Sequence, residues 1–142
     1  MDRLEKIQTT QAPAALGPYS QGVIVPSNAQ LIFVSGQLPI DLANGQLIQG
    51  DIGEMTALVL THIQHILQAA HSDLGFIIRT DVFLKDLNDF GRFNEVYQKY
   101  FSSPPLPARQ TIQAAKLPLD APIEISCIAL IPSQVKEGAH RG

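Results

Sequence analysis

Residues 123–131, which read IEISCIALI, decide the fold of this chain. In an extended strand, side chains alternate between the two faces. One face is then entirely apolar, because it carries Ile123, Ile125, Cys127, Ala129 and Ile131. The other face begins with Glu124 and Ser126 but continues with Ile128 and Leu130. In residues 31–35, too, both sets of alternating residues are apolar near the start, which predicts a strand that is buried on both faces.

Two amphipathic helices are predicted upstream of this strand. Asp51 begins the first helix, and Glu54, three residues later, completes a capping box. The apolar stripe of this helix continues to about Ala70 and consists of Met55, Val59, Ile63, Ile66 and Ala70. Asn88 or Asp89 caps the second helix, which Ser102-Ser103-Pro104-Pro105 ends. Its buried stripe consists of Phe90, Phe93, Tyr97 and Phe101.

The remaining extended segments complete a mixed sheet. Two of them lie within residues 19–37, on either side of a turn at residues 26–28, and Asn44-Gly45 marks a further turn. Residues 77–84 form a strand with Ile78, Thr80, Val82 and Leu84 on one face. Residues 109–113 form another, with one face made of Arg109, Thr111 and Gln113. The order of elements predicts an α+β two-layer domain, with both helices on one face of the sheet.

No helix remains to cover the second face of this sheet, on which Ile128 and Leu130 lie. An uncovered apolar sheet face predicts contact with another subunit. The composition agrees, because only 16% of the residues are charged, against about 25% in an average soluble domain.

Length and composition exclude several classes of protein. The 142 residues fit a single domain over residues 1–132, with a mobile tail over residues 133–142. A single cysteine excludes an intrachain disulfide and favours a reducing, cytoplasmic location. The charged segment from Met1 to Lys6 is unlike a signal peptide, and no apolar run reaches the ~18 residues of a membrane span. The net charge of −3 and the scattered basic residues count against nucleic-acid binding.

Histidine and cysteine give no strong sign of a metal site or a nucleophile. His62 and His65 lie three residues apart on the first helix, but no carboxylate stands at a matching step. We expect His62 to be partly buried and paired with a backbone group. Cys127 lies on an apolar strand face, where a small core residue is expected rather than a reactive thiol.

Three polar residues are better candidates for chemistry. Arg109 follows a rigid proline-rich segment and could grip a carboxylate with two parallel hydrogen bonds, or form an ordinary surface salt bridge. Glu124 stands between Ile123 and Ile125, where dry surroundings would favour its protonated form and suit acid–base catalysis; it could instead be a solvated ion-pair partner. Asn94 is on the inward side of the second helix and must be hydrogen-bonded, to the backbone or to a ligand.

With these residues in view, the sequence resembles the reactive-intermediate imine deaminase family, RidA or YjgF, from about Lys6 to Ile131. Three segments carry the resemblance, and a weaker fourth is found at residues 86–90 followed by Asn94. The three segments are APAALGPYSQG at residues 12–22, VSGQLP at residues 34–39, and the region from Pro107-Ala108-Arg109 through Leu117-Pro118 to Ile123-Glu124-Ile125.

The resemblance implies a chorismate-mutase-like fold, with a six-stranded mixed sheet and two helices on one face. It also implies a homotrimer with three clefts between subunits. The implied activity is hydrolysis of 2-iminobutanoate, 2-iminopropanoate and similar 2-imino acids to 2-keto acids and ammonia, without a cofactor or a metal. The partners expected are therefore small 2-imino or 2-keto acids and further copies of the chain, not a nucleic acid or a membrane.

The resemblance also implies a role for each matching residue. Arg109 would hold the substrate carboxylate, and Glu124 would orient and activate the water. Tyr19 would pack over the substrate, and Asn94 would line the cleft. The imine group and the water would be held by the backbone of Ser35, Gly36 and Thr111.

The sequence departs from the family pattern at three positions, and two other functions remain open. Ser126 stands where a second acid is frequent, Thr111 where many members have cysteine, and His71 where glycine is common. One alternative is a regulatory module that binds small carboxylates such as 2-ketobutanoate without turnover. The other is a protein-interaction or chaperone-like role.

Overall fold

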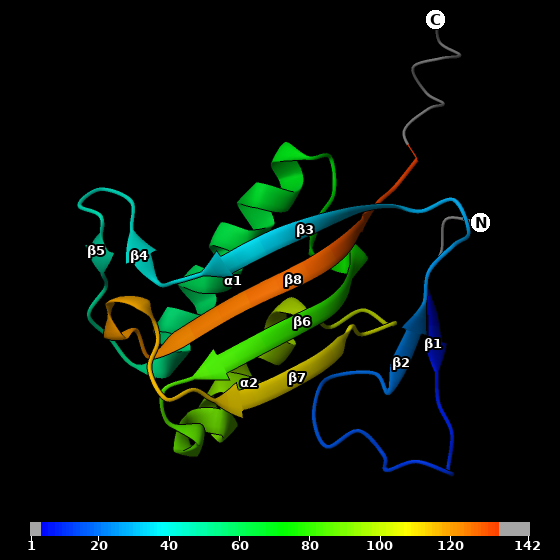
Figure 1. The fold of residues 1–142 in the computed structure, drawn as a ribbon, viewed down its shortest axis with the longest axis horizontal. Coiled ribbons are helices and arrows are strands. Elements are labelled where there is room, and N and C mark those ends of the chain that lie inside the picture. Colours follow the sequence, from blue (N-terminus) through cyan, green and yellow to red (C-terminus); the bar gives the residue numbers. More distant parts are fainter. Residues whose placement is uncertain (1–3, 134–142) are drawn as a thin grey trace, which may run out of the picture.

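The computed structural model describes residues 4–133, and it confirms the predicted α+β arrangement of two helices and a mixed sheet (Figure 1). The predicted tail lies outside the described residues from residue 134 onward. The strands are β1 (Glu5–Ile7), β2 (Gly22–Ile24), β3 (Gln30–Gln37), β4 (Ile40–Asp41), β5 (Gln46–Leu47), β6 (Ile77–Leu84), β7 (Ala108–Gln113) and β8 (Ile123–Ile131). The helices are α1 (Ile52–Ala69) and α2 (Phe90–Tyr100), with short 3₁₀ turns at Leu74–Phe76, Leu87–Asp89 and Pro118–Asp120.

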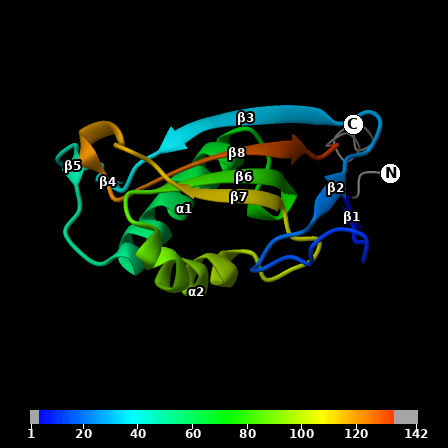
Figure 2. The ribbon, with the colours of Figure 1, turned by 60° about the horizontal axis from the view of Figure 1, so that its bottom comes forward.

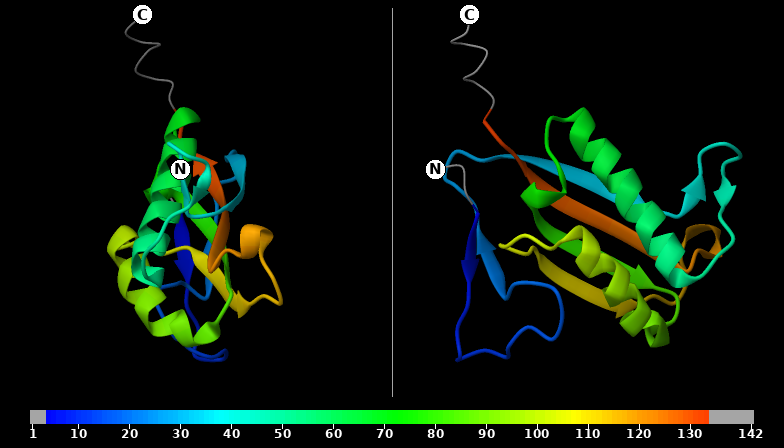
Figure 3. Two further views of the ribbon diagram at one scale, coloured as in Figure 1. Left: turned by 90° about the vertical axis from the view of Figure 1, so that its left-hand side faces the viewer. Right: turned by 180° about the vertical axis from the view of Figure 1, so that it is seen from behind.

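The central sheet has the strand order β3-β8-β6-β7. Strand β8 pairs antiparallel with both β3 and β6, whereas β6 and β7 are parallel. A parallel pair requires a crossover connection, and α2 provides it. Both helices lie on one side of the sheet and leave the other side open (Figures 2 and 3). The segment that decides the fold is thus an inner strand of the sheet.

The prediction of a six-stranded sheet is not confirmed for residues 4–133. Strands β1 and β2 pair with each other in a separate ribbon, and so do β4 and β5, which leaves four strands in the central sheet. The predicted turn after β2 is present, with the Ala29 amide donating to the Pro26 carbonyl over 3.1 Å. Strand β2 nevertheless does not pair with β3. Ser20, just before β2, is bonded at the other edge of the sheet, beside the start of β7. Its amide donates to the carbonyl of Pro107 and its hydroxyl donates to that of Leu106.

Helix α1 begins as predicted, with a complete capping box. The Glu54 amide donates to Asp51 Oδ1 over 2.8 Å, and the Asp51 amide donates to Glu54 Oε1 over 3.0 Å. The predicted stripe is correct at Met55, Val59 and Ile63 but too narrow, because the face against the sheet also includes the fully buried Leu60 and Leu67. Ile66 and Ala70 are only half-buried.

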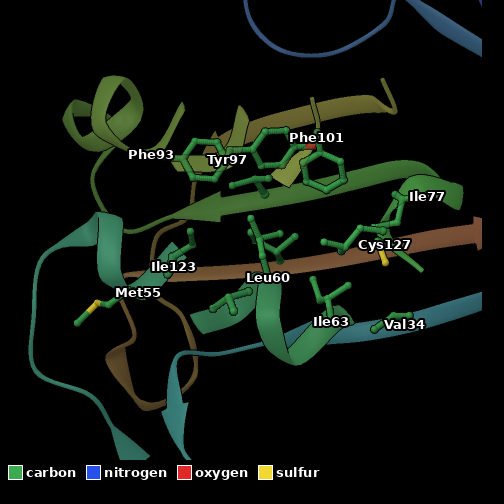
Figure 4. Packing of buried hydrophobic residues seen from close by; sticks show 14 of the residues in the cluster. Val34, Met55, Leu60, Ile63, Ile77, Phe93, Tyr97, Phe101, Ile123 and Cys127 are labelled. Atoms are coloured by element: carbon green, nitrogen blue, oxygen red, sulfur yellow. The ribbon is translucent and has the colours of Figure 1, made fainter. Parts of the chain in front are cut away.

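The core lies between the two helices and the sheet (Figure 4). Helix α2 contributes a file of rings, with Phe93 and Tyr97 5.2 Å apart and Tyr97 and Phe101 4.4 Å apart between ring centres. Strand β6 confirms the predicted face at Thr80, Val82 and Leu84 but not at Ile78. A bulge between Ile77 and Arg79 places Ile77 in the core instead, since one extra residue reverses the alternation.

The predicted apolar face without helical cover is present. Within residues 4–133, no helix packs on the side of the sheet that carries Ile128, and its side chains include the partly exposed Leu31 (39%), Phe33 (71%) and Ile112 (41%). We call this side the open face. Among the described residues, no helix combines the length and the hydrophobicity that crossing a membrane requires.

Candidate active site

The candidate residues form two separate groups on opposite faces of the sheet. Arg109 stands opposite Thr80, whose side chain is fully buried beneath the helices. Glu124 stands opposite Phe83. Phe83 alternates along β6 with the buried Val82 and Leu84, so both it and Glu124 lie on the open face. Within a single chain the two side chains therefore do not meet, and the predicted cleft between subunits stays a prediction.

The first group surrounds the guanidinium of Arg109 on the helix-covered face. Four aromatic rings lie around it, with 4.9 Å from the guanidinium carbon to the ring centre of Tyr97 and 5.2 Å to that of Tyr19. The rings of Phe93 and Phe90 follow at 5.4 and 5.6 Å. Such contacts attract a cation but provide no hydrogen-bond acceptor in the plane of the guanidinium. The charge is therefore held in largely apolar surroundings.

Asn94 provides the hydrogen bond that orients this guanidinium. Nη1 of Arg109 donates to Asn94 Oδ1 over 2.8 Å, so the amide predicted to line the cleft does contact the predicted carboxylate-binding residue. No carboxylate pairs with Arg109 among residues 4–133. Burial lowers the pKa of Arg109, and Tyr97 and Tyr19 partly offset the effect.

Two features of the sequence hold the loop before β2 against Arg109. The hydrogen bonds of Ser20 to residues 106 and 107, described above, fix Tyr19 beside the start of β7. Gly17 passes so near that a β-carbon there would lie 3.1 Å from Arg109 Nη2. A glycine at this position therefore permits the close approach of the loop.

The second group surrounds the carboxylate of Glu124 on the open face. Strand β3 is irregular between Val34 and Gln37, where its register against β8 shifts. The carboxylate lies over the backbone of this irregular segment, and a β-carbon at Gly36 would overlap Glu124 Oε2. Ser35, in the same segment, accepts a hydrogen bond at its carbonyl from Gln37 Nε2 over 3.1 Å. Gly36 therefore lies beside Glu124, with Ser35 next to it in the chain, whereas Thr111, which was predicted to act with these two residues, pairs with Val82 and lies on the helix-covered face.

The surroundings of Glu124 differ from the sequence expectation in one respect. Ile123 and Ile125 point to the helix-covered face and are fully buried there, so they do not surround the carboxylate. Its neighbour on the adjacent strand β6 is Phe83, and Glu124 itself is half-buried. Apolar surroundings on the open face come from neighbouring strands, not from the adjacent residues in sequence.

The structure also answers the questions about histidine and cysteine. His62 Nε2 lies 2.8 Å from the carbonyl oxygen of Ile40, which confirms a histidine paired with the backbone. Residues 4–133 contain no cluster of three or more histidine, cysteine or acidic side chains that could hold a metal ion. Burial raises the pKa of the Cys127 thiol to about 12, so it is protonated at neutral pH and is a core residue.

Sequence reasoning assigned the aromatic stripe of α2 to the core alone. Phe93 and Tyr97 do pack in the core, but their rings, with that of Phe90, also line the surroundings of Arg109. The spacing of these aromatic residues by three or four places their rings on one face of α2, and this pattern could have identified them as neighbours of Arg109. What was missing was the face of the sheet on which Arg109 lies.

Comparisons with known proteins identify relatives along nearly the whole chain. The model of the family described as Endoribonuclease L-PSP matches residues 9–131. The chain is 45% identical over 124 residues to 2-iminobutanoate/2-iminopropanoate deaminase of Bos taurus, which covers 87% of this chain and 88% of that protein. It is 44% identical over 125 residues to a RutC family protein of Pyrococcus abyssi, covering 88% of this chain and 95% of that protein.

Among solved structures, the chain is similar to that of TdcF from E. coli with bound serine. The two share 38% sequence identity with a TM-score of 0.66, over 89% of this chain and 98% of that one. The fold and the sequence thus agree on one group of relatives.

Proposed function

Because the chain belongs to the Endoribonuclease L-PSP family, which includes the YjgF and RidA proteins, we propose that it is a cofactor-free hydrolase of 2-imino acids. Its substrates would be 2-iminobutanoate and 2-iminopropanoate, and its products the 2-keto acids and ammonia. The observation that carries the proposal is the guanidinium of Arg109, which is desolvated by four rings and has one neutral hydrogen-bond partner among the described residues.

A guanidinium in this state is suited to bind a carboxylate. It has five N–H donors in a fixed plane, and Asn94 accepts from one of them. Arg109 is half-buried, and charges removed from water in proteins are normally paired, so an anion is the partner we expect. A carboxylate can accept two parallel hydrogen bonds from such a fork, and low polarity strengthens the attraction. Every 2-imino acid has a carboxylate next to its reacting carbon.

Glu124 provides the second chemical requirement. Hydrolysis adds water to the imine carbon and then breaks the carbon–nitrogen bond. Both protons of the water end on the nitrogen: one leaves as the water adds to the imine carbon, and the other leaves the new hydroxyl as the carbonyl forms and ammonia departs. A carboxylate can accept the first proton and return it to the leaving nitrogen, which typically contributes 10²–10⁴-fold. The backbone of Ser35 and Gly36, beside Glu124, would help to hold the water and the imine.

A complete site would need two copies of the chain, because Arg109 and Glu124 lie on opposite faces of the sheet. The open face exposes apolar side chains, of which Phe33 is the most exposed at 71%, as expected for an interface. If the Arg109 group of one copy meets the Glu124 group of the next, the contact is head-to-tail. Such contacts form a ring when the rotation between copies closes, and a homotrimer with three sites is the ring we propose.

The function is tested by generating 2-iminobutanoate and 2-iminopropanoate in situ and following the release of ammonia. We expect acceleration over buffer with the wild type and loss of that acceleration in Arg109→Ala. Arg92→Ala is the matched control, because Arg92 is an exposed arginine that pairs with Asp51 and Glu95. Wild-type rates equal to those in buffer, or full activity in Arg109→Ala, would contradict the proposal.

The alternative of a carboxylate-binding regulator predicts a different result in the same experiment. The wild type would bind 2-ketobutanoate without turnover, and Glu124→Ala would leave that binding intact. Cleavage of RNA is disfavoured by the net charge of −3, since nucleic-acid binding normally requires a basic patch. Strong, salt-dependent binding of RNA would instead support a function in RNA cleavage.

A further inference from the structure

The side chain of Gln21 closes the loop between β1 and β2. Its Oε1 accepts from the Thr9 amide over 2.7 Å. Its Nε2 donates to the carbonyl oxygens of Thr9, Ala12 and Pro13 over 3.1, 3.3 and 2.7 Å. An amide nitrogen has two hydrogens, so one of them is shared between two acceptors. A single side chain therefore joins the start, the middle and the end of the loop over residues 8–21.

Little packing holds this loop in place. It projects from the sheet (Figures 1 and 3), and residues 8–16 are all exposed. A cleft of about 570 Å³ lies between the loop and β1, and its lining includes Ile7, Thr10, Ala14 and Tyr19. Side-chain packing within residues 4–133 is thus sparse around the loop, and its hydrogen bonds set its shape.

The same loop forms one wall of the Arg109 group. Tyr19 is two residues before Gln21, and its ring centre lies 5.2 Å from the guanidinium carbon of Arg109. The Tyr19 hydroxyl accepts from the Leu16 amide over 3.0 Å, and the Tyr19 amide donates to the Gly17 carbonyl over 2.8 Å. The place of the Tyr19 ring therefore depends on the shape of the loop.

Ser20 and Gln21 hold different parts of the loop. Ser20, which is 4% exposed, bonds the backbone next to Tyr19 to residues 106 and 107. These bonds do not reach residues 9–16, which include the Leu16 amide that orients the Tyr19 hydroxyl. Gln21 is the side chain that ties this earlier part of the loop to its end.

We propose that Gln21 is a positioning residue, which closes the loop so that Tyr19 stands beside the guanidinium of Arg109 before the substrate arrives. This inference rests on the proposed function, and it assigns to Gln21 no contact with the substrate. A ligand that binds only the closed loop loses apparent affinity in proportion to the fraction of molecules in which the loop is closed. Gln21 thus acts on binding through Tyr19.

The first test is the binding of 2-ketobutanoate, a product that binds without reacting, to full-length Gln21→Ala. By calorimetry we expect binding to weaken about tenfold, because without the four hydrogen bonds the loop would be open in about nine molecules of ten. In turnover, KM should rise and kcat should change little, as for a loss of uniform binding. Gln68→Ala, at an exposed glutamine of α1, is the matched control and should change neither quantity.

Gln21→Glu tests the donated hydrogen bonds separately from the shape of the side chain. Glutamate has nearly the same shape as glutamine, but its ionised carboxylate accepts hydrogen bonds and donates none. It would also place an oxygen among the carbonyl oxygens that Nε2 now contacts. We therefore expect Gln21→Glu to bind 2-ketobutanoate as weakly as Gln21→Ala. A side chain that only filled space would be replaced by glutamate without loss.

Chymotrypsin, which cleaves after tyrosine, separates release of the loop from loss of the fold. The bond after Tyr19 is protected in the wild type, because Ser20 is buried. Gln21→Ala should be cleaved there faster, and saturating 2-ketobutanoate should slow the cleavage. The melting temperature should stay near that of the wild type, since the loop lies on the surface.

Three outcomes would overturn the inference and leave the proposed function intact. Unchanged binding and KM in Gln21→Ala would show that Tyr19 keeps its place without Gln21. Wild-type affinity in Gln21→Glu would show that the donated hydrogen bonds are not needed. A large fall in melting temperature or in assembly mass in Gln21→Ala would assign Gln21 to folding or to assembly. If the wild type itself neither binds 2-ketobutanoate nor turns over 2-imino acids, the proposed function fails together with this inference.

Discussion

The carboxylate of Glu124 lies directly over the backbone of Gly36, in the space that any β-carbon at position 36 would occupy. The contact joins β8 to the irregular segment of β3, and it fixes where the carboxylate stands on the open face. A side chain at position 36 would therefore have to displace the Glu124 carboxylate, and no positive φ angle adds to this constraint.

The first prediction concerns this contact. Gly36→Ala should displace the Glu124 carboxylate and reduce kcat by roughly 10²-fold or more, the usual contribution of a general base. Because the carboxylate of the ligand is assigned to Arg109, binding of 2-ketobutanoate should persist. Steady-state kinetics and calorimetry on the same preparation measure both quantities.

Gly91→Ala provides the control for that substitution. A β-carbon at Gly91 would meet no atom within 4 Å, and alanine in a helix is more stable than glycine by about 1 kcal/mol. Gly91→Ala should therefore retain full activity with equal or greater stability. A Gly36→Ala variant with wild-type kcat would show that the position of the carboxylate is unimportant.

The second prediction concerns the hydrogen bond between Tyr97 and Thr80 beneath Arg109. Tyr97→Phe leaves the fully buried Thr80 hydroxyl without a partner, which should lower the free energy of unfolding by about 1–3 kcal/mol. The double variant Tyr97→Phe/Thr80→Val removes both hydroxyls and should recover part of this loss. Urea unfolding of the two single variants and the double variant gives the coupling energy. If the losses of unfolding free energy in the two single variants simply add up in the double variant, the Thr80 and Tyr97 hydroxyls do not form a direct hydrogen bond.

The third prediction follows from two raised pKa values. Burial raises the pKa of Tyr97 from 10.0 to about 12 and that of Cys127 from 9.0 to about 12. The folded state thus holds both protons more tightly than the unfolded state, so this contribution to stability is complete below pH 9. It is lost as the pH rises from 9 to about 12, by on the order of 1–3 kcal/mol for each group.

Urea unfolding at several pH values between 8 and 12 measures this loss. Tyr97→Phe serves as the comparison, because its stability should fall less steeply between pH 10 and 12 than that of the wild type. Equal slopes in the two proteins would mean that Tyr97 does not titrate with folding.

The sequence predicts local structure well wherever the pattern is carried by neighbouring residues. The capping box at Asp51 and Glu54, the aromatic stripe of α2 and the alternation of β8 are all confirmed. Each depends on contacts within one element, or on one face that meets the core. The bulge at Ile77 was not predictable, since it comes from pairing between β6 and β8.

The orientation of β7 explains why the site could not be assembled from the sequence. Hydrophobic alternation alone would turn Ala108 and Ile112 toward the core. The structure does the opposite, with Arg109 and Thr111 facing the helices and Ile112 41% exposed on the open face. Functional sites are where local patterns conflict with the fold, and this inversion separates Arg109 from Glu124.

The central claim, that one site takes Arg109 from one copy and Glu124 from another, is tested most directly by mixing two inactive variants. Arg109→Ala and Glu124→Ala, carrying different affinity tags, are co-expressed and the mixed assemblies are isolated through both tags. In a three-membered ring that contains both variants, one of the three head-to-tail contacts, about one third, combines an intact Arg109 with an intact Glu124. We predict that the mixed assemblies regain deaminase activity of about that fraction of the wild type, while each variant alone stays inactive. Mixed assemblies of wild-type mass that remain inactive would contradict the account.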